Sequence, residues 1–147
     1  MLIRAAKQND FKSVLALLAH LNPDEPELSE SKSLHVYSQI LASENLTIIL
    51  AEKIDTIVGT CYLNIIPNLT RGASPYAVIE NVVTHPDYRR QGIGRALVAS
   101  ALETAKNRAC YKVMLLTGGN KGVQRFYESC GMNSGIKTAF IVRYDGL

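Results

Sequence analysis

The stretch YRRQGIGRAL, residues 88–97, holds two arginines, two glycines one residue apart and the start of a helix, in that order. The residues before it, YAVIENVVT at 76–84, predict a strand, so the full order is strand, tight turn, glycine pair and helix. The first N–H groups of a helix have no partner inside it, and the helix dipole adds partial positive charge there. Because glycine has no Cβ, ligand oxygens can approach these N–H groups closely. The stretch therefore predicts a pyrophosphate site, with further positive charge from Arg89, Arg90 and Arg95.

The alternative interpretation is a helix start that holds two glycines beside solvated arginines, since Gly-x-Gly alone is weak evidence. Two known phosphate loops are excluded. The pattern GxxxxGK[ST] is absent, and GxGxxG fails because residue 97 is Leu. What remains is Arg89-x-x-Gly92-x-Gly94, preceded by a strand that ends in VVT at 82–84.

This arrangement resembles motif A of the GNAT superfamily of N-acetyltransferases. Downstream, NKGVQRFYESCGM at 120–132 is similar to that family's N-x-x-A-x-x-x-Y-x-x-x-G-F signature, and Asn120 and Tyr127 stand at its usual spacing of seven. Val123 replaces the alanine and Met132 replaces the phenylalanine. The two motifs together are far more specific than either alone. Residues 78–132 also resemble, less strongly, glucosamine-6-phosphate N-acetyltransferases.

The resemblance implies an α+β acyl-CoA N-acyltransferase (GNAT) fold. The hydrophobic periodicity agrees with it and predicts one domain over residues 1–147, with a mixed sheet of six or seven strands flanked by about four helices. Strands are expected at 2–6, 46–51, 57–66, 76–84, 112–118 and 137–144. Helices are expected after Asp10, around 34–41, from Gly92 to about Arg108, and from Lys121 to Ser129, where Gly131 ends the last one.

The resemblance also assigns roles in binding acetyl-CoA. The backbone of Val82, Val83 and Thr84 would pair with the pantetheine arm, unless plain sheet pairing occupies it. Asn120 would bond the same arm, and it can also cap a helix. Backbone N–H groups would hold the pyrophosphate at Arg90, Gln91, Gly92, Ile93, Gly94 and Arg95.

Two residues are candidates for proton transfer. Tyr127 is the expected general acid, which protonates the departing thiolate; a core tyrosine is the alternative. Glu80 lies in the apolar strand AVIENVV, and because burying a carboxylate is costly we expect it to face a cleft and act as general base. Many relatives carry a glutamate at the position of Leu115, so that base is missing here. An exposed Glu80 on an alternating strand is an equal alternative, and His85 or water can serve instead.

Composition excludes other classes of function. The net charge of +3 and the absence of a Lys/Arg block argue against nucleic-acid binding. No apolar run of about 18 residues predicts a membrane span, and no signal-peptide pattern appears. Three cysteines without a CxxC pair predict reduced thiols in a cytoplasmic protein, and neither a metal site nor a cysteine intermediate is expected.

The predicted function is transfer of an acetyl group from acetyl-CoA to a primary amine by direct attack in a ternary complex. A small-molecule acceptor is preferred because the short chain has no obvious peptide-binding insert. The alternatives are a non-catalytic acyl-CoA-binding module and an acetyltransferase for a protein amine. The acidic residues at 24–30 favour a cationic acceptor and Arg71 favours an acidic one, so the sequence does not determine the identity of the acceptor.

The oligomeric state is not determined either: a homodimer is possible, but no residue locates an interface.

Overall fold

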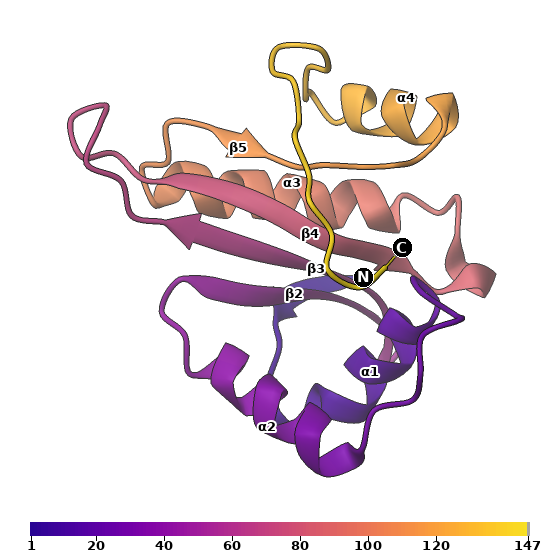
Figure 1. Cartoon of the computed structure of the whole chain (residues 1–147). Helices are drawn as coiled ribbons and strands as arrows, with labels where there is room; N and C mark the ends of the chain where they lie inside the picture. The colour runs from indigo at the N-terminus through magenta and orange to yellow at the C-terminus, as the bar shows by residue number, and fades with distance from the viewer. Residues whose placement is uncertain (147) are drawn as a thin grey trace. The chain divides into compact units, whose positions relative to one another are not determined.

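The computed structural model describes residues 1–146, and the chain divides into two compact units, one of residues 1–115 and one that begins at Leu116. The first unit contains an antiparallel meander whose last strand is joined by one parallel strand, so the sheet is mixed, as predicted. The single domain over residues 1–147 stays a prediction. The elements of the first unit are β1 (Leu2–Ala5), η1 (Gln8–Asp10), α1 (Phe11–Ala19), α2 (Glu30–Leu41), β2 (Leu46–Lys53), β3 (Thr56–Ile66), β4 (Tyr76–Thr84), η2 (Pro86–Tyr88), α3 (Ile93–Asn107) and β5 (Val113–Met114) (Figure 1).

Helices cover both faces of this sheet. Ile48 and Leu50 of β2 are buried against Phe11 of α1 and Tyr37 of α2. Tyr62 of β3 lies opposite Ile48, and Cys61, the residue before it, points to the other face: its thiol is 3.9 Å from the Leu97 carbonyl of α3. Because successive side chains of a strand alternate between faces, α1 and α2 lie on one side and α3 on the other (Figure 1).

Helix α3 packs closely on β3 at Gly59. A Cβ at this position would lie 2.9 Å from the Ile93 side chain and 3.0 Å from that of Leu97. Those distances are too short for a real contact, so the absence of a side chain at 59 lets the first turn of α3 sit directly on the sheet. This contact positions the glycine-containing helix start.

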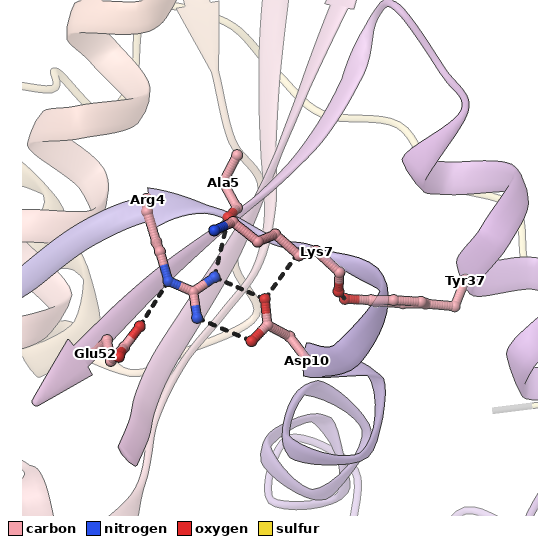
Figure 2. A network of polar contacts seen from close by, with 6 residues as sticks. All are labelled: Arg4, Ala5, Lys7, Asp10, Tyr37 and Glu52. Atoms are coloured by element: carbon pink, nitrogen blue, oxygen red, sulfur yellow. Dashed lines mark hydrogen bonds and ion pairs between the residues drawn. The ribbon is translucent and has the colours of Figure 1, made fainter. Parts of the chain in front are cut away.

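A network of charged groups joins the beginning of the chain to the sheet and to both helices of the first face (Figure 2). The Arg4 guanidinium donates to the Asp10 carboxylate at 2.7 and 2.9 Å and to Glu52 at 2.6 Å. Asp10 also accepts from the backbone N–H of Lys7 at 2.7 Å, and Tyr37 donates its hydroxyl to the Lys7 carbonyl at 2.8 Å. The hydrogen bonds from Arg4 hold the pKa of Asp10 below its usual range, despite its burial. The network therefore links β1, β2, α1 and α2.

Within residues 1–146 the sheet has five strands, so the prediction of six or seven was wrong. The strand expected at 112–118 is limited to Val113–Met114, and residues 137–144 form no strand. A strand persists only where a neighbour accepts and donates its backbone hydrogen bonds. β5 is an edge of the sheet in the described residues, and only its two residues opposite β4 are paired.

The second unit contains α4 (Lys121–Ser129), the helix expected there. It begins at Asn120, whose side-chain oxygen accepts from the backbone N–H groups of Gly122 at 2.9 Å and Val123 at 3.3 Å. It ends before Gly131, which has a φ of 88°. Glycine tolerates this left-handed conformation best, which is why the chain leaves the helix there.

Candidate active site

The start of α3 has the geometry that the glycine stretch predicts. Gly92 is the residue before the helix, with a φ of 79°, and its carbonyl accepts from Ala96 at 3.0 Å. In the described part of the chain no side chain caps this helix start, and no atom lies within 4 Å of a Cβ built at Gly92. A left-handed residue followed by a helical one turns successive N–H groups toward one point. The open space beside Gly92 is where an anion can meet them.

The side chains around this turn are mostly exposed. Arg89, Arg90, Gln91 and Arg95 all face solvent, and Arg90 is itself left-handed, with a φ of 61°. A cation that sequence analysis missed, Lys53 at the end of β2, donates to the Gln91 side chain at 2.8 Å. It also lies 5.9 Å from the centre of the Tyr88 ring. No motif includes Lys53, because it stands 38 residues before Gln91 in the chain.

The strand that leads into this turn, β4, is paired with β5 along only part of its length. β4 pairs with β5 at two positions, Ala77 with Val113 and Val78 with Met114. No further β4–β5 pair follows among residues 1–146, so β4 from Ile79 to Thr84 is paired only with β3. Val83 is buried, whereas Val82 and Thr84 are half-buried. The role of Val82–Thr84 toward the pantetheine arm, with plain sheet pairing as its alternative, stays a prediction.

A β-bulge interrupts β4 within the region that has no β5 partner in the described residues. The register with β3 shifts between Thr60 and Tyr62, and Asn81 opposite this gap has a φ of 52°. Asparagine tolerates the left-handed conformation better than most residues. A bulge bends its strand and ends regular pairing nearby.

Glu80, the residue before the bulge, is exposed and lies opposite Tyr62. Directly paired residues project to the same face, and Tyr62 packs with the cluster formed by α1 and α2. Glu80 is therefore on that face of the sheet, where α1 and α2 leave it open to solvent. Burial raises the pKa of Tyr62, so the neighbouring phenol stays protonated.

The same face carries a cluster of cations on aromatic rings. Tyr76 precedes Glu80 by four residues, so both project to one side. The Lys112 ammonium lies 5.1 Å from the centre of the Tyr76 ring and 5.3 Å from that of Tyr111. The Arg71 guanidinium lies 5.6 Å from the Tyr111 ring. We call Arg71, Tyr76, Tyr111 and Lys112 the cationic cluster.

His85 has a structural role at the start of η2. Its Nδ1 accepts from the Asp87 backbone N–H at 3.3 Å and so caps η2. Its ring contacts those of His20, at 5.1 Å between centres, and Tyr88, at 5.7 Å. Together with residues of α1 and the beginning of β3 it lines a cavity of about 280 Å³.

Asn120 and Tyr127 belong to the second unit. The expected helix cap at Asn120 is confirmed by its two backbone hydrogen bonds, and its bond to a cofactor stays a prediction. Tyr127 is half-buried on α4, with its ring centre 5.0 Å from that of Phe126. Seven residues make about two helical turns. Asn120, which caps α4, and Tyr127, within it, therefore lie on the same face of the helix.

Comparison with known proteins decides the family. A profile of the acetyltransferase (GNAT) family matches residues 14–132. The chain belongs to the GNAT family of acetyltransferases. It is therefore an N-acetyltransferase, and the resemblance drawn from the two motifs is confirmed. Members of this family use acetyl-CoA as acetyl donor.

Individual relatives agree with this assignment. Glucosamine 6-phosphate N-acetyltransferase of Trypanosoma brucei brucei is 32% identical over 133 residues, which cover 90% of this chain and 88% of that protein. A putative acetyltransferase from Agrobacterium tumefaciens str. C58 is 46% identical, with a TM-score of 0.93 over 97% of this chain and 99% of that one. An aminoglycoside N-acetyltransferase in complex with CoA shares the fold at 20% identity, with a TM-score of 0.80 over 97% of this chain and 93% of that one.

The structure also describes the length of the helices and the surroundings of the cysteines. No helix in the described residues is long and apolar enough to cross a membrane. Cys61 is a buried free thiol, and Cys110 and Cys130 are half-buried free thiols. Burial raises the pKa of Cys61 to about 12, so this thiol is a poor nucleophile.

Proposed function

We propose that this GNAT enzyme transfers the acetyl group of acetyl-CoA to the primary amine of a small molecule by direct attack in a ternary complex. The uncapped start of α3 at Gly92 carries the proposal. It supplies N–H groups from Arg90 to Arg95, the partial positive charge of a helix end and open space for a pyrophosphate. The surrounding arginines and Lys53 add charge of the required sign.

The edge of β4 supports the position of the pantetheine arm. From Ile79 to Thr84 this edge is left without a β5 partner in the described residues, and it leads directly to η2 and the start of α3. An extended amide chain can add to such an edge as a strand would. The arm then runs along Val82–Thr84 while the pyrophosphate occupies the turn.

The reaction needs two proton transfers. The amine nitrogen attacks the thioester carbon, the C–S bond breaks, and the nitrogen loses a proton. Glu80 is our candidate to accept that proton directly or through water, since it is exposed beside the bulge, two residues beyond the last β4–β5 pair. Tyr127 is our candidate to protonate the thiolate, and Asn120 to hold the cofactor arm. A His85 base is less favoured because its Nδ1 already caps η2.

An amino sugar with an anionic group is the acceptor that the site favours. The Trypanosoma relative acts, by its name, on glucosamine 6-phosphate. In this chain the cationic cluster lies on the same sheet face as Glu80, four residues or about 13 Å along the strand. The acidic residues at 24–30 are exposed; Asp24, Glu25 and Glu27 lie in a loop, and Glu30 begins α2. An amine held near Glu80 can therefore carry an anion toward Lys112 and Arg71.

Calorimetric titration with acetyl-CoA tests the cofactor site. We expect micromolar affinity for the wild type and its loss in Gly92→Val. Gly72→Val is the matched control, because Gly72 also has a positive φ, 68°, and open space around its Cβ. Equal affinity in all three proteins would contradict the pyrophosphate site.

Thiol release with a panel of amines tests the acceptor. Glucosamine 6-phosphate should be acetylated faster than glucosamine, and Lys112→Met should remove that preference. Faster turnover of an aminoglycoside would contradict the anionic acceptor, and turnover of peptide amines alone would contradict a small-molecule acceptor.

A further inference from the structure

One face of the β3–β4 hairpin is only partly covered, and it carries polar side chains that belong to no sequence motif. Along β3 the residues at 61, 63 and 65 are buried, whereas Tyr62 is half-buried and Asn64 is exposed. Because the side chains of a strand alternate between faces, Tyr62 and Asn64 project to the side away from α3. This is the face on which Glu80 lies.

The register of the two strands places both residues beside the candidate base. Tyr62 lies opposite Glu80, and Asn64 lies opposite Val78. Directly paired residues have Cβ atoms about 4.5–5.5 Å apart, so Tyr62 is the cross-strand neighbour of Glu80. Asn64 is two residues, or about 7 Å, further along β3. It therefore lies between Glu80 and the cationic cluster, whose Tyr76 is opposite the next residue of that face.

The polar groups of Tyr62 and Asn64 can bind a ligand. Among residues 1–146 no hydrogen bond to the Tyr62 hydroxyl or to the Asn64 side-chain amide is present, and neither group is a buried unpaired atom. The Tyr62 ring packs against the cluster that contains Tyr37 and Ile48, which holds its hydroxyl in place. Both groups are thus exposed to whatever molecule occupies this face.

We propose that Tyr62 and Asn64 determine the specificity for the acceptor by binding the hydroxyl groups of a sugar ring. The amine of this sugar lies at Glu80, and its anionic group points toward Lys112. The inference rests on the proposed function and names the residues that recognise the ring. A phenol and a carboxamide both donate and accept hydrogen bonds, as sugar hydroxyls do. A simple amine with an anionic group would satisfy the two charged ends alone and would leave these two polar groups to water.

Steady-state kinetics with two acceptors of similar charge test the proposal. Glucosamine 6-phosphate has ring hydroxyls, whereas phosphoethanolamine carries an amine and a phosphate without them. Tyr62→Phe and Asn64→Ala should each raise the KM for glucosamine 6-phosphate about fivefold, as expected for one lost hydrogen bond. The KM for phosphoethanolamine and the affinity for acetyl-CoA should not change.

The matched controls are Asn107→Ala and Tyr144→Phe. Asn107 is an exposed asparagine at the end of α3, and Tyr144 is an exposed tyrosine outside the first unit. Both controls should leave the KM for either acceptor unchanged. An unchanged KM in Tyr62→Phe and Asn64→Ala would overturn the proposal. An equal rise for the two acceptors would also overturn it, because the variants would then act through Glu80 or the sheet.

Calorimetry separates this inference from the proposed function. CoA-saturated protein should bind glucosamine 6-phosphate about fivefold more weakly in either variant, whether or not the amine is turned over. A wild type that acetylates amines but binds glucosamine 6-phosphate no better than the variants do would overturn the role of Tyr62 and Asn64 alone. A wild type that neither binds this sugar nor acetylates any amine would contradict the proposed function and this inference together.

Discussion

Glu80 lies directly opposite Tyr62 in the β3–β4 ladder, on the sheet face that α1 and α2 partly cover, and the β-bulge at Asn81 follows it immediately. In the described residues the last β4–β5 pair is at Val78, so Glu80 and the bulge both lie in the part of β4 that has no β5 partner. Glu80 therefore lies just beyond the end of the β4–β5 pairing, and it is exposed although its strand is otherwise apolar. This position makes its role as general base testable.

Replacing Glu80 by Gln should lower kcat about 100-fold, since a positioned base contributes at least that factor. Affinity for acetyl-CoA should stay unchanged, because the proposed role concerns the amine. Steady-state kinetics and calorimetry measure the two effects. Glu103→Gln, at an exposed position of α3, is the control and should leave both unchanged. An unaltered kcat in Glu80→Gln would move the role to His85 or to water.

Tyr127→Phe removes only a hydroxyl from α4, so its effect isolates the proposed general acid. We expect kcat to fall by about 100-fold with little loss of acetyl-CoA affinity. Tyr144→Phe, which removes the hydroxyl of an exposed tyrosine of the same unit, should have no effect on kcat. Equal turnover in wild type and Tyr127→Phe would exclude Tyr127 as the acid.

Arg4→Met should lower the free energy of unfolding by about 3 kcal/mol at pH 7, because it leaves the carboxylate of Asp10 without its cation. The Asp10 side chain is only 7% exposed. Arg143→Met is the control: its ion pair with Asp145 is half-exposed, at 47% and 55%, and should contribute less than about 1 kcal/mol. Urea denaturation measures both.

The effect of Arg4→Met should depend on pH with a definite sign. Because Arg4 lowers the pKa of Asp10 in the folded state, the stabilisation is complete above the unfolded-state pKa of about 3.9. It is lost as the pH falls through the lower, folded-state pKa. The difference between wild type and Arg4→Met should therefore shrink in strongly acidic solution. A constant difference would show that Arg4 acts through packing alone.

Cys61 should resist thiol reagents in the folded protein, because burial raises its pKa to about 12 and it lies under α3. Cys110 and Cys130, both half-buried, should react first. Titration with a chromogenic disulfide, before and after unfolding, counts the protected thiols. Cys61→Ala should retain acetyltransferase activity, whereas loss of turnover in a folded variant would reveal a cysteine intermediate.

Most of the elements that form the candidate site could be predicted from the local sequence. The strand at 76–84, the turn, the helix from Gly92 and the cap of α4 at Asn120 were all predicted where they occur. Each depends on interactions within a few residues: side-chain alternation, a left-handed glycine, and a side-chain oxygen that caps a helix. The family resemblance rests on the same short segments.

Contacts between distant residues could not be predicted in this way. Lys53 donates a hydrogen bond to Gln91, which is 38 residues away in the sequence, and Arg4 donates one to Glu52, 48 residues away. The bulge at Asn81 depends on the register with β3, which no local pattern specifies. The length of β5 depends on which edges have partners.

The sequence by itself thus determined the order of elements, the family and the candidate residues, because periodicity, capping and spacing are properties of neighbouring residues. Only the tertiary structure decided that, within residues 1–146, β4 has no β5 partner beyond Val78, that Glu80 is exposed at a bulge, and that residues 137–144 form no strand. The reason is physical: a strand requires the hydrogen-bonding groups of another strand, and the fold decides whether that neighbour is present.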